Sequence, residues 1–369
     1  MRHSLTFLLL IISSLVGAQK YESFIQKAES FESSNPDSVI FYAQKAILEN
    51  VENQSDAYAW MALGLRFKNQ YDSSKYWYQK ALDAADTDTQ MAIAKMGLGG
   101  IAYSQGSYEN ALTLFTEAAN FFEKSGNMEK LGSAYSNIGI IMNVNDNDEK
   151  AIHYFKSSIE LFDELNLETK KLPALVNLST VYRKKEKYDS AIFYAQQCYD
   201  ISLRLDFKFG QAKALVILAP SFTESGDPSR GYDFAKKGRE LFEEMGAEAT
   251  VRLMKLYEAE ALLGLGRTEQ ALTICRNLEE LDLEISMEEH LYRTMASIYA
   301  KMGKYEMALR YQQKFHEVYE AFIDENQSKR IDELEAKFET ERKETEIVLL
   351  RSEAAVKESA DAKKNWVII

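Results

Sequence analysis

The stretch GGIAYSQGSYENALTLFTEA, from Gly99 to Ala118, decides the fold, because its pattern of small and aromatic residues returns along the chain. A small residue is followed twelve positions later by a second small residue. The first position recurs at intervals of 40 residues, and once at 37. A shorter version opens earlier, at Gly64. The two sets are Gly99, Gly139, Ser179, Ala219, Ala259 and Ala296, and Ala111, Ala151, Ala191, Gly231, Ala271 and Ala308.

A period kept over this many units is typical of a solenoid built from pairs of antiparallel helices. Small residues let the two backbones of a pair approach, whereas a large side chain at the crossing point would hold them apart. One pair cannot bury its apolar face alone, so stacking of neighbouring pairs supplies the core. We expect aromatic side chains to fill the remaining spaces, namely Tyr108, Phe115, Tyr154, Phe155, Tyr188, Tyr194 and Tyr305.

The composition favours helices and argues against a nucleic-acid partner. The 369 residues include only 4 Pro and 17 Gly, and 46% are hydrophobic, which is enough for a sizeable core. The net charge is −13, whereas a protein that binds nucleic acid needs a positive surface. We therefore expect no nucleic acid to bind within this chain.

These repeats resemble the tetratricopeptide repeat family. The resemblance is carried by Asn137–Gly139 (NIG), by Asn177–Ser179 (NLS) and by KMGKYEMAL from Lys301 to Leu309. It implies an all-α fold, a right-handed α-solenoid of about eight helix pairs over residues 20–322. The period of 40 exceeds the family's usual value of about 34, so longer helices are expected. Pro220 falls inside a first helix, where it predicts a tolerated bend or a flexible joint.

The sequence offers no catalytic, metal or cofactor site, so the segment is not expected to be an enzyme. No histidine lies in a metal-binding or catalytic spacing, and His153 is expected to be partly buried. The glycines of GLGG at Gly97–Gly100 lack the preceding strand of a phosphate loop. Cys198 and Cys275 fall about two repeats apart, too far for a disulfide, so both are predicted to be buried thiols.

Peptide binding is the activity that the family resemblance implies. In that family the first helices line a concave groove that holds ligand peptides. Asparagine can both donate to and accept from an extended backbone, and Arg183 with Lys184 could bind a carboxylate. The alternative is that these asparagines serve packing and that Arg183 is solvated. The predicted groove residues are Asn137, Ile140, Asn143, Asn177, Thr180, Arg183, Lys184, Arg293, Thr294 and Ser297.

The N-terminal residues have the features of a leader peptide. Arg2 and His3 precede an apolar run from Leu5 to Val16, and small residues suit cleavage after Ala18. This layout predicts a secretory signal peptide over residues 1–18 and an exported protein. An uncleaved anchor is the alternative.

The C-terminal residues change character after residue 322. Residues 323–364 are highly charged with a weak heptad seam, which predicts a coiled-coil helix and a homodimer through it. A single charged helix is the alternative. Residues 365–369 begin with Asn365 and Trp366 and continue Val-Ile-Ile, which predicts the start of a transmembrane helix near Trp366 that the sequence cuts short. A hydrophobic fray is the other interpretation.

This order of segments resembles the extracytoplasmic region of bacterial repeat-containing membrane sensors, of the histidine kinase or helix-turn-helix regulator type. The resemblance implies a sensor module on the periplasmic face, anchored in the cytoplasmic membrane. A peptide or protein would bind in the groove, and the coiled-coil helix would transmit the change. The alternative is a secreted or periplasmic scaffold without signalling output.

Overall fold

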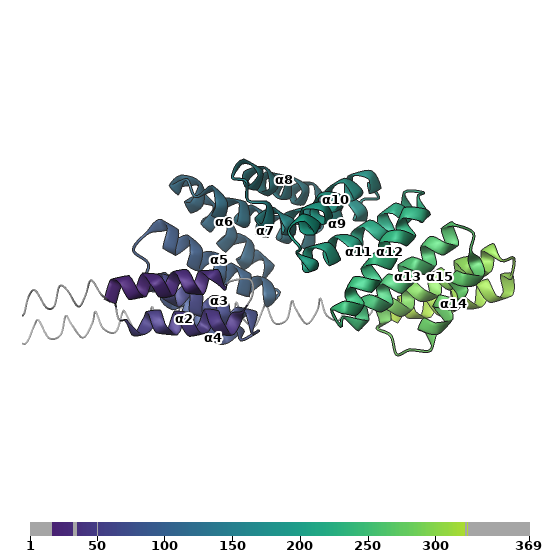
Figure 1. Ribbon diagram of the computed structural model, residues 1–369, viewed down its shortest axis with the longest axis horizontal. Helices are drawn as coiled ribbons and strands as arrows, with labels where there is room; N and C mark the ends of the chain where they lie inside the picture. The colour runs from purple at the N-terminus through teal and green to yellow at the C-terminus, as the bar shows by residue number, and fades with distance from the viewer. Residues whose placement is uncertain (1–16, 32–34, 50, 322, 324–369) are drawn as a thin grey trace, which may run out of the picture. The chain divides into compact units, whose positions relative to one another are not determined.

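The computed structural model describes residues 17–31, 35–49, 51–321 and 323. Within these ranges the chain is a succession of helices joined by short connections, with no strand (Figure 1). The predicted all-α solenoid of about eight helix pairs is confirmed. Most of the expected leader, almost all of the expected coiled coil and the expected membrane entry lie outside the described residues, so those expectations stay predictions.

The chain divides into two compact units, Met1–Leu281 and Asp282–Ile369. In the first unit a helix over residues 17–30 pairs with α2 (Pro36–Leu48), and each later pair has a first and a second helix. The first helices are α3 (Ser55–Phe67), α5 (Asp88–Ser104), α7 (Met128–Val144), α9 (Glu168–Lys184), α11 (Lys208–Glu224) and α13 (Glu248–Gly264). The second helices are α4 (Tyr71–Asp83), α6 (Tyr108–Ser125), α8 (Asp148–Glu164), α10 (Tyr188–Arg204), α12 (Pro228–Glu244) and α14 (Thr268–Glu279).

The second unit contains α15 (Ile285–Lys301) and a helix over residues 305–321. The division falls where the sequence period shortens from 40 to 37. The preceding helix, α14, has only 12 residues, and a longer connection follows it.

Helix length accounts for the long period. Both α8 and α9 have 17 residues, and three residues separate each from the helix before it. Two such helices with two such connections make one 40-residue unit. The expectation of longer helices is therefore correct.

From α5 to α14, each connection turns the chain through one residue with a left-handed backbone. Between α7 and α8 this residue is Asp146, with φ 54°. The N–H of Asn147 donates to the carbonyl of Met142 at 2.8 Å, and the N–H of Asp146 donates to Asn143, so the last carbonyls of α7 are satisfied. The Asn147 side chain then caps α8 by accepting from the N–H of Lys150. Left-handed residues recur every 20 positions: Gly106, Gly126, Asp146, Asn166, Glu186, Asp206, Gly226, Gly246 and Gly266.

The small-residue positions meet at the helix crossings as predicted. Ala111, Ala151 and Ala191 are each 0% exposed. In the α3–α4 pair the matching residues are Ala62 and Ser74, whose hydroxyl donates to the Ala62 carbonyl at 2.7 Å. Gly64, which the sequence suggested as the opening residue, instead packs against Ile40 of α2, because that position faces the preceding pair.

Aromatic residues stack within the pairs, although not all of those expected. Phe115 and Phe155 are 3% and 1% exposed and lie in the core. Tyr182 of α9 and Tyr194 of α10 stack with centroids 5.6 Å apart. The expectation was wrong for Tyr305, which is 74% exposed near the start of the helix over residues 305–321.

The remaining sequence predictions concern single residues. Both cysteines are free and buried, as predicted. His153 is exposed rather than partly buried, because it lies on the outer side of α8. Helix α11 continues through the buried Pro220 to Glu224, and α9 contains a second proline, Pro173. In the described part of the chain, no helix combines the length and apolar character that a membrane crossing needs.

Candidate ligand-binding groove

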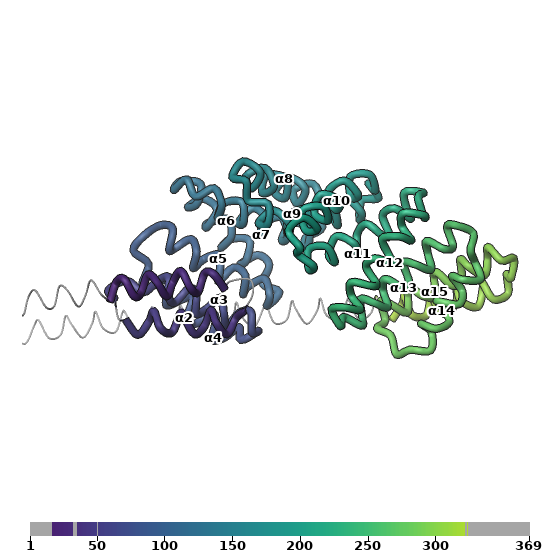
Figure 2. The backbone as a smooth tube through the Cα atoms, viewed as in Figure 1, coloured from purple at the N-terminus to yellow at the C-terminus, as the bar shows by residue number. Residues whose placement is uncertain are grey.

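The first helices present one continuous face in the first unit. Helix α9 contacts both α7 and α11, and in Figures 1 and 2 these three helices follow the inner side of the bend that α8 and α10 follow outside. Along α7 and α9, residues three or four positions apart are partly or fully exposed here. Residues with this spacing lie on one side of a helix. We call this surface the first-helix face. Its residues are Lys130, Ser133, Asn137 and Ile140 in α7, and Lys170, Pro173, Asn177, Thr180 and Lys184 in α9.

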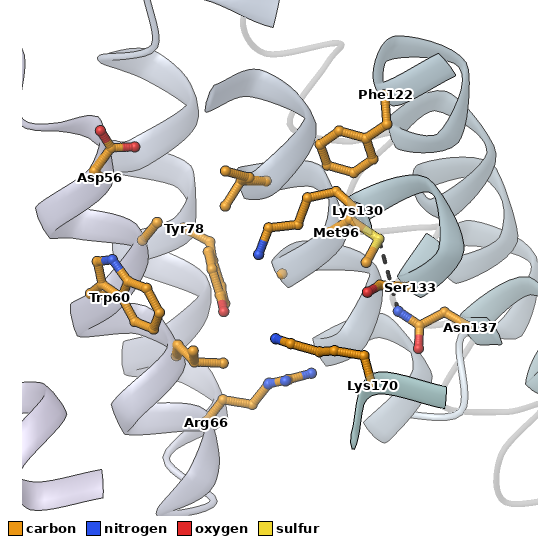
Figure 3. Close-up of a pocket in the computed structure, with 14 residues that line it drawn as sticks. Asp56, Trp60, Arg66, Tyr78, Met96, Phe122, Lys130, Ser133, Asn137 and Lys170 are labelled. Atoms are coloured by element: carbon orange, nitrogen blue, oxygen red, sulfur yellow. Dashed lines mark hydrogen bonds between the residues drawn. The ribbon is translucent and has the colours of Figure 1, made fainter. Parts of the chain in front are cut away.

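A pocket of about 210 Å³ opens on the first-helix face (Figure 3). Helices α3, α5 and α7 supply most of its wall, and α4, α6 and α9 supply one residue each. Ligand pockets for drug-sized molecules usually occupy about 300–1,000 Å³, so this one suits a single side chain or chain end. The lining residues are Asp56, Ala59, Trp60, Leu63, Arg66, Tyr78, Ile93, Met96, Gly97, Phe122, Lys130, Ser133, Asn137 and Lys170.

Three cationic side chains converge on the pocket. Figure 3 shows Arg66 entering from one side, and Lys130 and Lys170 from the other. Lys170 also pairs with Glu129, with 3.5 Å between the charged atoms. Asp56 is the only carboxylate among the lining residues, and it accepts a hydrogen bond from Gln90 at 3.2 Å. The pocket is therefore basic in a chain whose net charge is −13.

The Arg66 guanidinium is incompletely satisfied. Its Nε is buried and has no hydrogen-bond partner among the described residues. An unpaired buried donor costs about 1–3 kcal/mol, and more when it is charged. An anion bound beside Arg66 would remove that cost.

Apolar and neutral polar groups complete the pocket wall. Trp60 and Tyr78 lie on the side from which Arg66 enters (Figure 3). On the opposite side the Asn137 side-chain amide lies 3.8 Å from the sulfur of Met96, which is a weak acceptor. Asn137 therefore keeps hydrogen-bonding capacity for a ligand.

The structure brings only part of the predicted groove set together. Asn137 lines the pocket, and Ile140 packs partly into the core below the first-helix face. The side-chain oxygen of Asn143 is buried and has no partner among the described residues. Asn177 lies 40 residues after Asn137 and is half-buried. Thr180 is exposed, with its hydroxyl donating to the carbonyl of Val176 at 2.9 Å.

The predicted cations Arg183 and Lys184, at the end of α9, form ion pairs with carboxylates of other segments. Arg183 lies 3.5 Å from Glu224, and Lys184 lies 2.8 Å from Asp146 and 3.2 Å from Asp148. A hydrogen bond to Asp146 is the main cause that raises the pKa of Lys184. A ligand carboxylate would have to compete with these pairs, so the pocket cations are better placed to bind one.

Three predicted groove residues belong to the second unit. Arg293 is exposed on α15. Thr294 is only 3% exposed, with its hydroxyl donating to the His290 carbonyl at 2.9 Å. Ser297 is exposed and donates to the Arg293 carbonyl at 3.0 Å. Both hydroxyls are thus engaged with their own helix.

Sequence reasoning missed the cations of the pocket. Lys130 and Lys170 lie 40 residues apart, each seven positions before a predicted asparagine, so the repeat register could have found them. Arg66 and Trp60 carry no such signal, since α3 precedes the regular 40-residue register. Within the described ranges, no group of three or more His, Cys, Asp or Glu side chains could hold a metal ion.

A family model matches part of the repeat array. The model "tetratricopeptide repeat" matches residues 130–204, which span α7 to α10. The chain carries tetratricopeptide repeats. It is accordingly a helical repeat module of the protein-binding type. No curated protein sequence matches the chain.

Solved structures with tetratricopeptide-type folds are similar to the chain at low identity. A signal transduction ATPase with a tetratricopeptide repeat sensor from Pyrococcus horikoshii has a TM-score of 0.62 at 15% identity, covering 77% of this chain and 45% of that one. A Rap protein complexed with Competence and Sporulation Factor has a TM-score of 0.56 at 14% identity, covering 84% of this chain and 99% of that one. The apo quorum sensor NprR from B. thuringiensis has a TM-score of 0.56 at 12% identity, covering 82% of this chain and 98% of that one. These likenesses concern the fold.

Proposed function

We propose that the repeats bind a peptide, or an extended segment of a protein, along the first-helix face. The observation that carries the proposal is the basic pocket, where Arg66, Lys130 and Lys170 converge beside Asn137. Open polar positions continue from the pocket along α7 and α9, which suits an extended chain. Asparagine amides on such a face can pair with both backbone groups of a peptide.

The proposed biological role is that of a sensor. The expected leader over residues 1–18 and the membrane entry near Trp366 support an exported protein anchored in the cytoplasmic membrane. The expected coiled coil over residues 323–364 supports a homodimer that passes the binding signal on. Among proteins with this fold, NprR is a quorum sensor and the archaeal ATPase carries a repeat sensor, and these properties support the proposal by analogy of fold.

A binding experiment with matched charge reversals tests the groove. The full chain is screened against a positional-scanning library of nonapeptides, and the best pool is titrated by calorimetry. Lys130→Glu should weaken binding at least tenfold. Lys75→Glu makes the same charge change at an exposed site on the second helix α4, and should leave binding unchanged. Equal effects of the two variants, or no binding by the unaltered chain, would contradict the proposal.

Fractionation of producing cells tests the sensor role. The proposal expects the protein in the cytoplasmic membrane, and expects protease added to spheroplasts to remove the repeats. Recovery of the intact protein from the soluble periplasmic fraction would instead favour the scaffold without signalling output.

A further inference from the structure

Three aromatic rings surround the ammonium group of Lys80 at the α3–α4 pair. This nitrogen lies 4.9 Å from the ring centroid of Tyr76, 5.1 Å from that of Trp77 and 5.8 Å from that of Tyr58. Contacts within about 6 Å of a centroid are cation–π contacts. Trp77 meets Tyr76 at an interplanar angle of 77° and Tyr58 at 38°. We call these three rings the cage, and none of them lines the pocket on the first-helix face.

The cage is held by contacts that do not involve Lys80. The Tyr58 hydroxyl donates at 2.6 Å to the side-chain oxygen of Gln54, which is itself buried. Trp77 is partly buried against the core cluster that α3, α4 and α5 share. Tyr76 is 55% exposed, so the cage opens to solvent on this side. The cage therefore keeps at least two of its walls when Lys80 leaves it.

Lys80 is a replaceable occupant of the cage. A side-chain hydrogen bond with Tyr76 is the main cause that raises the pKa of Lys80, and the tyrosines rather than any carboxylate supply the other causes that raise it. An exposed cation–π contact is worth only about two- to fivefold in an equilibrium constant. A primary ammonium is also strongly hydrated, so it gives up water on entering the cage. A quaternary ammonium has no N–H groups and loses less hydration, and aromatic cages are well suited to such cations.

We propose that the cage is a second ligand site, which binds a trimethylammonium group once Lys80 swings out. The proposal does not rest on the proposed peptide binding, because it concerns different residues. Free choline and the headgroup of phosphatidylcholine share this chemistry. The net charge of −13 favours the approach of a cationic ligand.

Saturation-transfer NMR on the full chain with choline tests the cage. The control ligand is the neutral carbon isostere of choline, in which a tert-butyl group replaces the trimethylammonium. Choline should bind at least about tenfold more tightly than this isostere, because the rings attract the charge. Since Lys80 competes for the cage, Lys80→Met should tighten choline binding about two- to fivefold. Lys45→Met is the matched control, because Lys45 also lies in the last turn of a second helix but over the single ring of Phe41, at 5.5 Å.

A second pair of variants tests the exposed wall of the cage. Tyr76→Ser should weaken choline binding about two- to fivefold through the loss of one ring. Phe193→Ser removes a similarly exposed ring from the sixth residue of α10, the same position that Tyr76 has in α4, and should leave choline binding unchanged. Both rings are more than half exposed, so neither change should unfold the chain.

Sedimentation with phosphatidylcholine vesicles distinguishes the two sources of the ligand. Binding to these vesicles that free choline reverses assigns the lipid headgroup, whereas binding of free choline alone assigns a small solute. Three results would overturn the proposal: equal binding of choline and its isostere, no binding by either the unaltered chain or Lys80→Met, and equal tightening by Lys45→Met. Peptide affinity measured on the same variants should not change, so this result and that for the proposed function are separable.

Discussion

Gly139 of α7 lies against the ring of Phe155 in α8, so that a Cβ on the glycine would be 2.7 Å from Cε1 of the ring. The same relationship, with the same distance, joins Gly99 to Phe115 one unit earlier. One unit later the two positions hold Ser179 and Ala195, both 0% exposed. The helices of a pair thus meet with either glycine against phenylalanine or two small residues together.

A double-mutant cycle should reveal this complementarity. Gly139→Ala forces overpacking of about 1–3 kcal/mol, offset in part by about 1 kcal/mol of helix propensity, so we expect net destabilisation of about 1 kcal/mol. Phe155→Ala should cost about 3–5 kcal/mol by leaving a cavity. Combining Gly139→Ala with Phe155→Ala places two small residues together, as in the next unit, and should cost at least about 1 kcal/mol less than the sum of the two single changes. Urea unfolding measures all four proteins, and strict additivity would show that the contact is not coupled.

The left-handed residue Glu186 should be a site for stabilisation. Its φ is 56°, which costs a side chain with a Cβ about 1–2 kcal/mol and costs glycine almost nothing. Glu186→Gly should therefore raise the free energy of unfolding by about 1 kcal/mol. Gly126→Ala, at φ 70° with open space around it, should lower it by a similar amount. Thermal melts of both variants test these two expectations, and a loss of stability in Glu186→Gly would contradict the strain argument.

The ion pair between Arg239 and Glu258 should matter more than the ion pairs at the surface. Arg239 Nε lies 2.6 Å from Glu258, whose side chain is only 9% exposed, and this contact raises the pKa of Arg239. Removing one partner of a buried pair leaves an uncompensated charge, so Arg239→Ala should cost about 3 kcal/mol. Arg204→Ala breaks the exposed pair with Glu168 and should change stability by less than about 1 kcal/mol. Equal losses in chemical denaturation would show that burial does not decide the effect.

Both thiols should be unreactive in the folded protein. Burial raises the pKa of Cys198 to about 11 and that of Cys275 to about 12. Because the raised pKa favours the neutral thiol, neither cysteine should be alkylated by iodoacetamide at pH 8. Both should react once urea unfolds the chain and their pKa values return to the ordinary range. Mass spectrometry at timed intervals follows the labelling, and fast labelling without urea would contradict the buried placement.

The sequence predicts most of the architecture because the repeated small residues act locally. Ala151 and Ala191 mark the helix crossings directly, and their 40-residue spacing gives the pairs. The left-handed positions were harder to recognise, because glycine, asparagine, aspartate and Glu186 share one backbone conformation there. The division into two compact units after Leu281 depends on how neighbouring helix pairs pack. The shortened spacing of 37 residues indicates this division only weakly.

The candidate site was predicted less completely, since a pocket depends on missing side chains as much as on present ones. Asn137 was found because it follows the repeat register. The sequence showed Gly97 and Gly100 only as glycines unsuited to a phosphate loop, and in the structure both lie within α5. Their effect depends on Arg66 and Tyr78, which come from the two preceding helices and reach these glycines only in the folded protein.

The connection that turns at Asp146 has the same length, a left-handed residue at the same position and the same backbone hydrogen bonds as the connection 40 residues later, which turns at Glu186. Cutting the chain at two such corresponding points and rejoining it recreates a junction that the molecule already contains. A gene encoding these repeats can therefore gain or lose one unit by recombination between them, and the reach of its binding surface can change without a new kind of joint.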